Sequence, residues 1–226
     1  MKNTLNDVIE VLTVEYQKHL LQEDFIPLKS RELGLTPLEQ LIGIILSQNT
    51  TDRNAFNALT NLIKHMSGRV TLSKLRDINV VELASVIRKA GMQMLKARTI
   101  KKLAEVLNSE EELMVLDVSE LVKKLRGVKG IGPKTIDVFL ANVRNIPIFP
   151  IDTHIRRVLY RLGYIRSKNE EYEVIRDKVV KDLPPEKLLT AHYILILHGR
   201  KTCKARKPLC NSCVVNNLCD KVGVVN

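Results

Sequence analysis

The chain has 226 residues, of which 45% are hydrophobic and 27% charged. This length is enough to bury a sizeable core and is typical of one domain or of two closely packed lobes. The formal net charge of +11, from 36 basic and 25 acidic residues, favours a polyanion as partner. The longest apolar run, LIGIIL at 41–46, is too short to cross a membrane, so we expect an intracellular protein of the cytoplasm or nucleoid with no membrane partner.

Apolar residues recur with helical spacing along nearly the whole chain, and no run alternates in the manner of a β-strand. The predicted fold class is therefore all-α. The clearest helix start is the capping box Thr36-Pro37-Leu38-Glu39, with proline at the first helical position, and this helix is expected to end near Ser47. Further helices are expected around 80–89, 95–107 and 117–125.

Two polar or glycine-containing segments mark other helix boundaries. The run at 47–52 is expected to form a loop in which Thr51 or Asp52 caps the following helix. The last long helix is expected over about 185–198, with Gly199 as its C-cap.

A glycine-rich turn, GIGPKT at 130–135, separates two of the predicted helices. Gly130 and Gly132 let the backbone turn sharply and approach another molecule, while Pro133 starts the next helix. Amides at that helix start can bind a phosphate at the positive end of the helix dipole. Aromatic residues make up only 4%, with no tryptophan, so a duplex backbone is favoured over stacked single strands. Five basic residues surround the turn: Lys123, Lys124, Arg126, Lys129 and Lys134.

Lys134 falls at the second position of the helix after the turn, where the helix dipole repels a cation. Nearby positive charges favour the neutral amine, which is the nucleophilic form of lysine. From this observation alone, a surface lysine that binds phosphate is the commoner explanation and a catalytic amine is the alternative.

Asp152, in the segment PIDTH, has an obvious local role as the N-cap of the following helix. It could also share a cleft with Lys134, and a carboxylate that stabilises an oxocarbenium-like sugar beside an attacking amine suits glycosidic chemistry. The histidines His154, His192 and His198 are expected to pack or cap rather than to bind a ligand.

The four cysteines of the chain lie close to its C-terminus in the spacing C-x6-C-x2-C-x5-C. Such a run suits a [4Fe-4S] cluster or a zinc ion. Zinc usually takes two C-x2-C pairs and only one is present, so the spacing favours iron and sulfur. Two disulfides would need an oxidising compartment, and the N-terminal residues are too interrupted by charge to be a secretory signal. The cysteines are Cys203, Cys210, Cys213 and Cys219.

Taken together, these motifs resemble the helix-hairpin-helix DNA glycosylase superfamily and, within it, the endonuclease III family. The resemblance covers most of the chain. The segments that carry it are LSQNTTD at 46–52, GMQMLKA at 91–97, GVKGIGPKT at 127–135, IDTHIRRVLYRLG at 151–163 and LHGRKTCKARKPLCNSCVVNNLC at 197–219.

The resemblance implies two helical lobes. One is a six-helix barrel with the helix-hairpin-helix, expected over residues 29–140. The other, from residues 1–28 and 141–226, carries a [4Fe-4S] cluster held by the four cysteines. The expected partner is double-stranded DNA with a damaged base or an abasic site, bound by a monomer, and the damaged base is flipped out of the duplex.

By position, the resemblance makes Lys134 the nucleophile that attacks C1′ of the flipped nucleotide and forms a Schiff base, from which β-elimination cuts the strand 3′ to the abasic site. Asp152 matches the carboxylate that stabilises positive charge on the sugar. A bifunctional DNA glycosylase and AP lyase for oxidised pyrimidines is therefore expected. The alternatives are a glycosylase for uracil or thymine opposite guanine, and a non-catalytic DNA-binding module with a zinc loop.

The same resemblance assigns residues that contact DNA. Gly130 and Gly132 are expected to bind one phosphate through their amides. Either Gln48 or Asn49 is expected to fill the gap left by the flipped base, and Met92 is expected to be an apolar wedge in the opposite strand, although a core methionine is an alternative. A second phosphate is expected to be bound beside the cluster by Lys204, Arg206 and Lys207.

Overall fold

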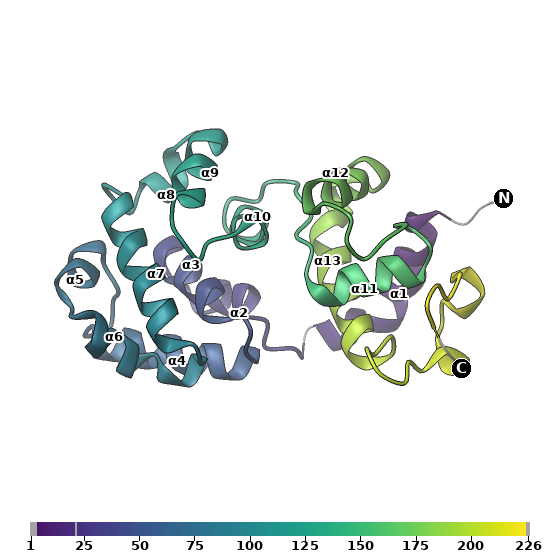
Figure 1. The fold of residues 1–226 in the computed structure, drawn as a ribbon, viewed down its shortest axis with the longest axis horizontal. Coiled ribbons are helices and arrows are strands. Elements are labelled where there is room, and N and C mark those ends of the chain that lie inside the picture. The colour runs from purple at the N-terminus through teal and green to yellow at the C-terminus, as the bar shows by residue number, and fades with distance from the viewer. Residues whose placement is uncertain (1–3, 21, 225–226) are drawn as a thin grey trace. The chain divides into compact units, whose positions relative to one another are not determined.

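The computed structural model describes residues 4–20 and 22–224 and contains only helices and connecting segments among them. The predicted all-α class is confirmed. By internal contacts the chain divides into two compact units, Asp24–Asn145 and Met1–Glu23 with Ile146–Asn226 (Figure 1). The six-helix barrel and its expected bounds at 29–140 stay a prediction. No helix within the described residues is long and apolar enough to cross a membrane.

The unit Asp24–Asn145 is built around α3, a helix in which every residue from Leu38 to Leu46 is buried. Helices α2, α4, α7, α8 and α10 all contact it. The helices of this unit are α2 (Ile26–Glu32), α3 (Pro37–Leu46), α4 (Asp52–His65), α5 (Leu72–Asp77), α6 (Val80–Val86), η1 (Arg88–Ala90), α7 (Gln93–Val106), α8 (Glu112–Val115), α9 (Val118–Arg126) and α10 (Pro133–Asn142).

The start of α3 has the predicted capping box. The backbone amide of Thr36 donates to Oε2 of Glu39 at 2.9 Å, and the amide of Glu39 donates to Oγ1 of Thr36 at 3.2 Å. Oε1 of the buried Glu39 also accepts the amide of Val70 at 3.0 Å, so the cap joins the start of α3 to the segment after α4. The helix ends at Leu46 with Ser47 as its C-cap, as predicted.

The other unit is organised by α13, whose residues from Ala191 to Gly199 are all buried. It packs against α1 and α11. The helices of this unit are α1 (Leu5–Leu20), α11 (Thr153–Arg161), α12 (Tyr172–Asp182), α13 (Pro185–Lys201), η2 (Cys210–Ser212) and η3 (Asn216–Leu218).

Gly199 is not the C-cap that the sequence predicts. The helix continues to Lys201, with Thr202 as C-cap. A Cβ atom at Gly199 would lie 2.9 Å from Cβ of His154 on α11, which is closer than two carbon atoms can pack. Gly199 therefore allows α11 and α13 to pack closely, and it does not terminate the helix.

Other helix boundaries follow the predictions closely. Thr51, and not Asp52, caps α4, because its side chain accepts the amide of Asn54. The helix expected over 80–89 ends at Val86 and is followed by η1, and the one expected from 95 begins at Gln93. Among the helices without a prediction are α5, α8 and α12; the first two are too short to show a clear period.

Replacing Gly199 by alanine should lower the free energy of unfolding by about 1–3 kcal/mol, because the added methyl group forces α11 and α13 apart. The shift in denaturation midpoint, measured at matched iron content, tests this. Thr190→Ala, at an exposed position of α13, is the control and should leave the midpoint unchanged or slightly raised. Equal midpoints for Gly199→Ala and wild type would contradict the packing role.

Candidate functional site

The predicted site residues divide between the two units. Lys134 and Asp152 belong to different units, so the expectation that they share a cleft stays a prediction. The residues in Asp24–Asn145 are Gln48, Asn49, Met92, Gly130, Gly132 and Lys134, and those in the other unit are Asp152, Cys203, Lys204, Arg206, Lys207, Cys210, Cys213 and Cys219.

The turn between α9 and α10 requires a glycine at position 130. Gly130 has a φ of 102°, and a Cβ atom there would lie 2.2 Å from Oγ1 of Thr99 on α7. That hydroxyl donates to the carbonyl oxygen of Lys129 at 3.0 Å, so α7 holds the turn in place. Gly132 differs, because its φ is −95° and the space around a Cβ atom would be open.

The start of α10 combines first-turn amides that no side chain caps with an exposed cation. Gly132 is exposed and is the N-cap of α10, with no side chain to satisfy the first-turn amides, and Pro133 is the first helical residue. Lys134 follows and is exposed. The arrangement can bind an anion and brings a primary amine close to it.

The basic cluster around the turn is smaller than the sequence suggests. Lys123, Arg126 and Lys129 are exposed. Lys124 is partly buried, and its Nζ forms an ion pair with Oε2 of Glu112 at 2.8 Å. Lys124 therefore stabilises the contact between α8 and α9 and is not available to a phosphate.

The loop between α3 and α4 separates the roles of Gln48 and Asn49. Nε2 of Gln48 donates to the carbonyl oxygen of Gly130 at 3.0 Å and to Oγ1 of Thr135 at 2.9 Å, which ties this loop to the hairpin. Asn49 is exposed and has a φ of 52°. Its Nδ2 lies 3.8 Å from Sδ of Met92, so these two side chains are neighbours on the surface.

Met92 is not a core methionine. It is 49% exposed, and it adopts a left-handed conformation with a φ of 48° immediately before α7. Met94 and Leu95, in the first turn of α7, are also exposed large hydrophobic residues. Such a protruding apolar group suits insertion into a base stack.

Asp152 has the predicted capping role. Its Oδ1 accepts the amide of Ile155 at 2.7 Å at the start of α11, and the residue is partly exposed. One carboxylate oxygen is thus held in a fixed direction by the helix. His154 is partly buried on the same turn, and burial lowers its pKa, so the ring stays neutral near pH 7.

All four cysteines line one cavity, together with apolar side chains that include Val158, Leu162, Leu209 and Val215. None of them forms a disulfide. In the described chain, no three Cys, His, Asp or Glu side chains converge on one metal ion. A tetrahedral zinc ion needs each thiolate about 2.3 Å from one centre, whereas in a [4Fe-4S] cluster each thiolate binds a different iron. A cavity lined by four thiols fits a cluster in which each thiolate binds a different iron.

The pKa values of two of the thiols indicate that thiolates at this site need a nearby positive charge, which iron would provide. Burial raises the pKa of Cys213 and of Cys219, which favours the protonated thiols in the absence of a cation. Ligation requires the thiolates, and iron would supply the positive charge that stabilises them. His198 is buried beside Cys213, and burial lowers the pKa of its ring to about 4, so it is a neutral packing residue as predicted.

Two arginines that the sequence analysis did not single out hold the loop that begins at Cys203. The guanidinium of Arg161, which is 8% exposed, donates to the carbonyl oxygens of Cys203 at 3.3 Å, Lys204 at 2.7 Å and Ala205 at 3.1 Å. It also lies 3.4 Å from Sγ of Cys203. Nε of Arg157 donates to the same Cys203 carbonyl at 3.0 Å. Both lie on one face of α11, but the oxygens that they bind are more than forty residues away, so the local sequence gives no signal of this role.

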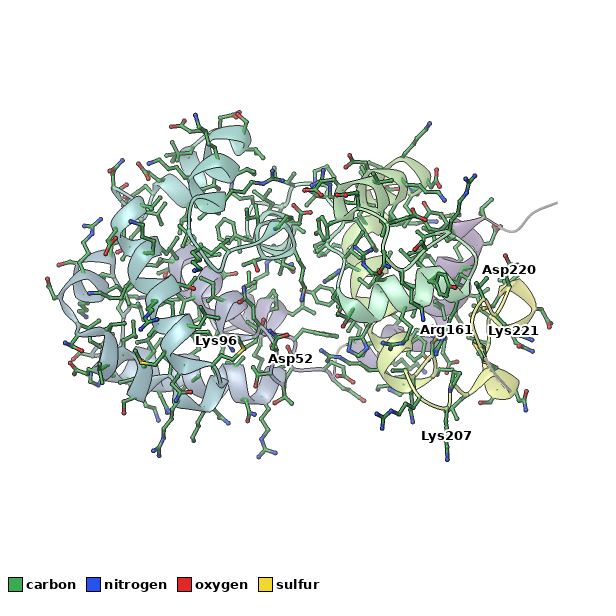
Figure 2. The ribbon with its side chains drawn as sticks, in the orientation of Figure 1. Asp52, Lys96, Arg161, Lys207, Asp220 and Lys221 are labelled. Atoms are coloured by element: carbon green, nitrogen blue, oxygen red, sulfur yellow. The ribbon has the colours of Figure 1, made fainter. Side chains whose placement is uncertain are left out.

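The cationic side chains of this loop point to solvent. Lys204, Arg206 and Lys207 are all exposed, and Lys207 has a φ of 51°. Figure 2 labels Arg161 on α11 and Lys207 on the loop. Because Arg161 fixes the backbone from Cys203 to Ala205, the loop can present its charges in one arrangement to a phosphate.

Comparison with known proteins gives two family matches. Residues 42–185 match the HhH-GPD superfamily of base excision DNA repair proteins, and residues 203–219 match the iron-sulfur binding domain of endonuclease III. Endonuclease III of Sulfolobus acidocaldarius is 40% identical over 179 residues, 79% of each chain. Endonuclease III of Escherichia coli K12 is 33% identical over 195 residues, 86% of this chain and 89% of that protein.

Solved structures agree with these matches. A trapped endonuclease III–DNA covalent intermediate has a TM-score of 0.72 and 30% identity, covering 82% of this chain and 84% of that chain. A thermostable thymine-DNA glycosylase has a TM-score of 0.73 over 95% and 94% of the two chains. Its identity is only 19%, so this second likeness shows the fold alone.

Arg161→Met should reduce the iron retained by the purified protein and weaken DNA binding, because the carbonyls of the cysteine loop lose their common donor. Iron content and the absorbance of the cluster measure the first effect. Arg156→Met is the matched control: Arg156 lies on the same helix and donates to the carbonyl oxygens of Lys168 and Glu170, away from the cysteines. Equal iron loss in both variants would mean that the effect is only general destabilisation.

Proposed function

Because the chain belongs to the endonuclease III family of HhH-GPD superfamily base excision DNA repair proteins, we propose that it removes oxidised pyrimidines from duplex DNA and then cleaves the strand 3′ to the abasic site. Membership of this family makes it a DNA glycosylase and AP lyase that binds DNA and holds a [4Fe-4S] cluster. The residue roles and the lesion class are the proposal.

Lys134 is the nucleophile, and the observation that carries this assignment is its exposed amine at the start of α10, beside the first-turn amides. Its Nζ attacks C1′ of the flipped nucleotide, and the glycosidic bond breaks as the base leaves with a proton. Ring opening gives a Schiff base between Nζ and C1′. Loss of a proton from C2′ then expels the 3′ phosphate by β-elimination, and hydrolysis of the imine releases the lysine.

Asp152 stabilises the positive charge that develops on the sugar as the base departs. The amide of Ile155 fixes one oxygen of its carboxylate, which supports a preset orientation. A carboxylate held in this way needs little reorganisation when the charge appears. It can also accept the protons that the amine releases.

Two surfaces hold the DNA backbone. The amides around Gly130 and Gly132 bind one phosphate at the positive end of α10. The exposed side chains of Lys204, Arg206 and Lys207 bind a second phosphate beside the cluster. Each contact anchors the backbone while the damaged base leaves the stack.

Asn49 fills the gap left by the flipped base, and Met92 unstacks the opposite strand. Asn49 is favoured over Gln48 because the amide of Gln48 is bound to Gly130 and Thr135, whereas Asn49 is exposed next to Met92. An amide side chain can replace hydrogen bonds that the orphaned base loses. Insertion in this way lowers the cost of extruding a base, which is least for a damaged one.

The cluster, held by Cys203, Cys210, Cys213 and Cys219, organises the cationic loop rather than the chemistry. Glycosidic cleavage and β-elimination transfer no electron. The active form is a monomer. We place its action where the DNA is, in the cytoplasm and nucleoid.

Lys134→Ala should abolish the covalent adduct that borohydride traps between protein and abasic DNA, because it removes the amine that is proposed to form the imine. Denaturing electrophoresis of the trapped mixture measures it. Lys129→Ala, which removes another exposed lysine of the hairpin, should weaken binding but still form the adduct at saturating protein. Wild-type adduct yield from Lys134→Ala would show that Lys134 only binds phosphate.

The same trapping assay on a panel of duplexes tests the lesion class. We expect adducts with thymine glycol and other oxidised pyrimidines. Adducts only with uracil or thymine opposite guanine would replace the proposed substrate by mismatched bases. Binding without any adduct, by a colourless protein that lacks iron, would support a non-catalytic module with zinc.

Asp152→Asn should slow base removal by about 100-fold or more while largely retaining DNA affinity, because asparagine keeps the N-cap but removes the charge. Single-turnover excision and binding isotherms measure the two effects. Asp117→Asn, at the N-cap of α9, is the control for loss of a capping carboxylate and should excise at the wild-type rate. An equal rate for Asp152→Asn would leave Asp152 only its capping role.

A further inference from the structure

Lys96 is a buried cation in the unit Asp24–Asn145 with no part in the chemistry proposed above. Its side chain is on α7, and the residue is 2% exposed (Figure 2). Nζ donates to the carbonyl oxygens of Leu46 at 2.8 Å, Gln48 at 2.7 Å and Ala90 at 2.8 Å. Within residues 4–20 and 22–224 no carboxylate forms an ion pair with it. Its three donors are therefore all used on backbone oxygens.

Each of these oxygens lies at or just beyond the C-terminal end of a helix, where no helical amide donates to it. Leu46 is the last residue of α3 and Ala90 the last of η1, while Gln48 lies in the loop after α3. Carbonyl oxygens at helix C-termini carry partial negative charge, which a cation offsets. Burial lowers the pKa of Lys96 to about 8, so the ammonium form still dominates at neutral pH, and the carbonyl oxygens favour that form.

The two segments that Lys96 joins carry the residues assigned to the opened duplex. Asn49 follows Gln48, and Met92 follows Ala90 by two positions. Asn49 and Met92 both have positive φ values, 52° and 48°, which residues other than glycine hold only where the surroundings fix them. The backbone amide of Lys96 also donates to the carbonyl oxygen of Met92 at 3.0 Å.

We propose that Lys96 is a positioning residue for base extrusion: its ammonium fixes the segments of Asn49 and Met92 to each other, so that the gap-filling and wedge side chains enter the duplex as one rigid unit. The inference rests on the roles proposed above for those two side chains. Gln48 extends the connection, because its carbonyl binds Lys96 while its side chain binds Gly130 in the hairpin. Insertion is thereby linked to the phosphate-binding turn.

The test compares a step that needs insertion with one that does not. The first is the fluorescence rise of 2-aminopurine placed opposite a tetrahydrofuran abasic analogue in a duplex, which reports unstacking by the wedge. The second is borohydride trapping on a single-stranded abasic oligonucleotide, which has no opposite strand. Lys96→Met should slow the fluorescence rise by about tenfold or more, while the trapping rate changes by less than about threefold.

Lys101→Met is the matched control. Lys101 is also on α7, and its Nζ donates to the carbonyl oxygens of Arg76 at 2.6 Å and Ile78 at 2.8 Å, away from Asn49 and Met92. It should leave both rates unchanged after correction for folded protein. If Lys96→Met does not fold, Lys96→Gln, which keeps two donors, is measured in the same way and should show the same selective slowing of the fluorescence rise.

Three outcomes would overturn the proposal: an unchanged fluorescence rate in the Lys96 variant, equal slowing of insertion and trapping, or the same slowing in Lys101→Met. A further readout is a double-mutant cycle, in which the effects of Lys96→Met and Met92→Ala on insertion should be strongly non-additive. The tetrahydrofuran duplex has no base to excise and no aldehyde to trap. A wild-type protein that inserts but does not excise oxidised pyrimidines would therefore refute the proposed substrate and leave the role of Lys96 standing.

Discussion

Buried cations that bind backbone carbonyl oxygens are the interaction on which the functional loops depend. Lys96 holds three such oxygens in one unit, and Arg161 holds three in the other. The loops at or just after these oxygens have little regular secondary structure, so few backbone hydrogen bonds would otherwise fix them. A buried cation without its acceptors is costly, and this penalty favours the one loop conformation that satisfies all the donors. Each unit thus gains ordered loops without adding a helix or a strand.

Ordered loops matter because the chemistry depends on placing a rigid duplex against a few fixed groups. A phosphate gains little from a flexible lysine, since ordering the side chain and the loop offsets part of the Coulomb attraction. In this protein the glycine turn is locked by the contact between Gly130 and Thr99, and the cysteine loop is locked by Arg161. The conformational entropy of these loops is therefore lost when the protein folds and not when it binds DNA. The cluster would order its loop in the same way, because Cys203 and Cys210 bind it from either side of the cationic segment, which has too few apolar residues to form a core of its own.

Local signals made much of the fold and site predictable from the sequence. The capping box of α3, the glycines of the hairpin and the cysteine spacing each involve residues near one another in the chain, and their chemistry is specific. Gly199 shows where such reasoning fails: a glycine near a helix end suggested a cap, but its cause is the distant His154. Lys96 and Arg161 were missed for the same reason. The oxygens that Lys96 binds are up to fifty residues away, and those of Arg161 more than forty, so no local pattern identifies them.

Lys96 and Lys134 show how burial assigns opposite roles to one residue type. Lys96 has every donor occupied and almost no exposure, so its nitrogen has no free lone pair to attack a sugar and acts only as a fixed charge. Lys134 is exposed at the start of α10, so its amine is open to a molecule that binds there. A nucleophilic amine must approach the carbon that it attacks, which an exposed side chain can do and a buried one cannot. The buried lysine therefore suits the positioning role and the exposed one suits the proposed role of nucleophile, and neither could replace the other.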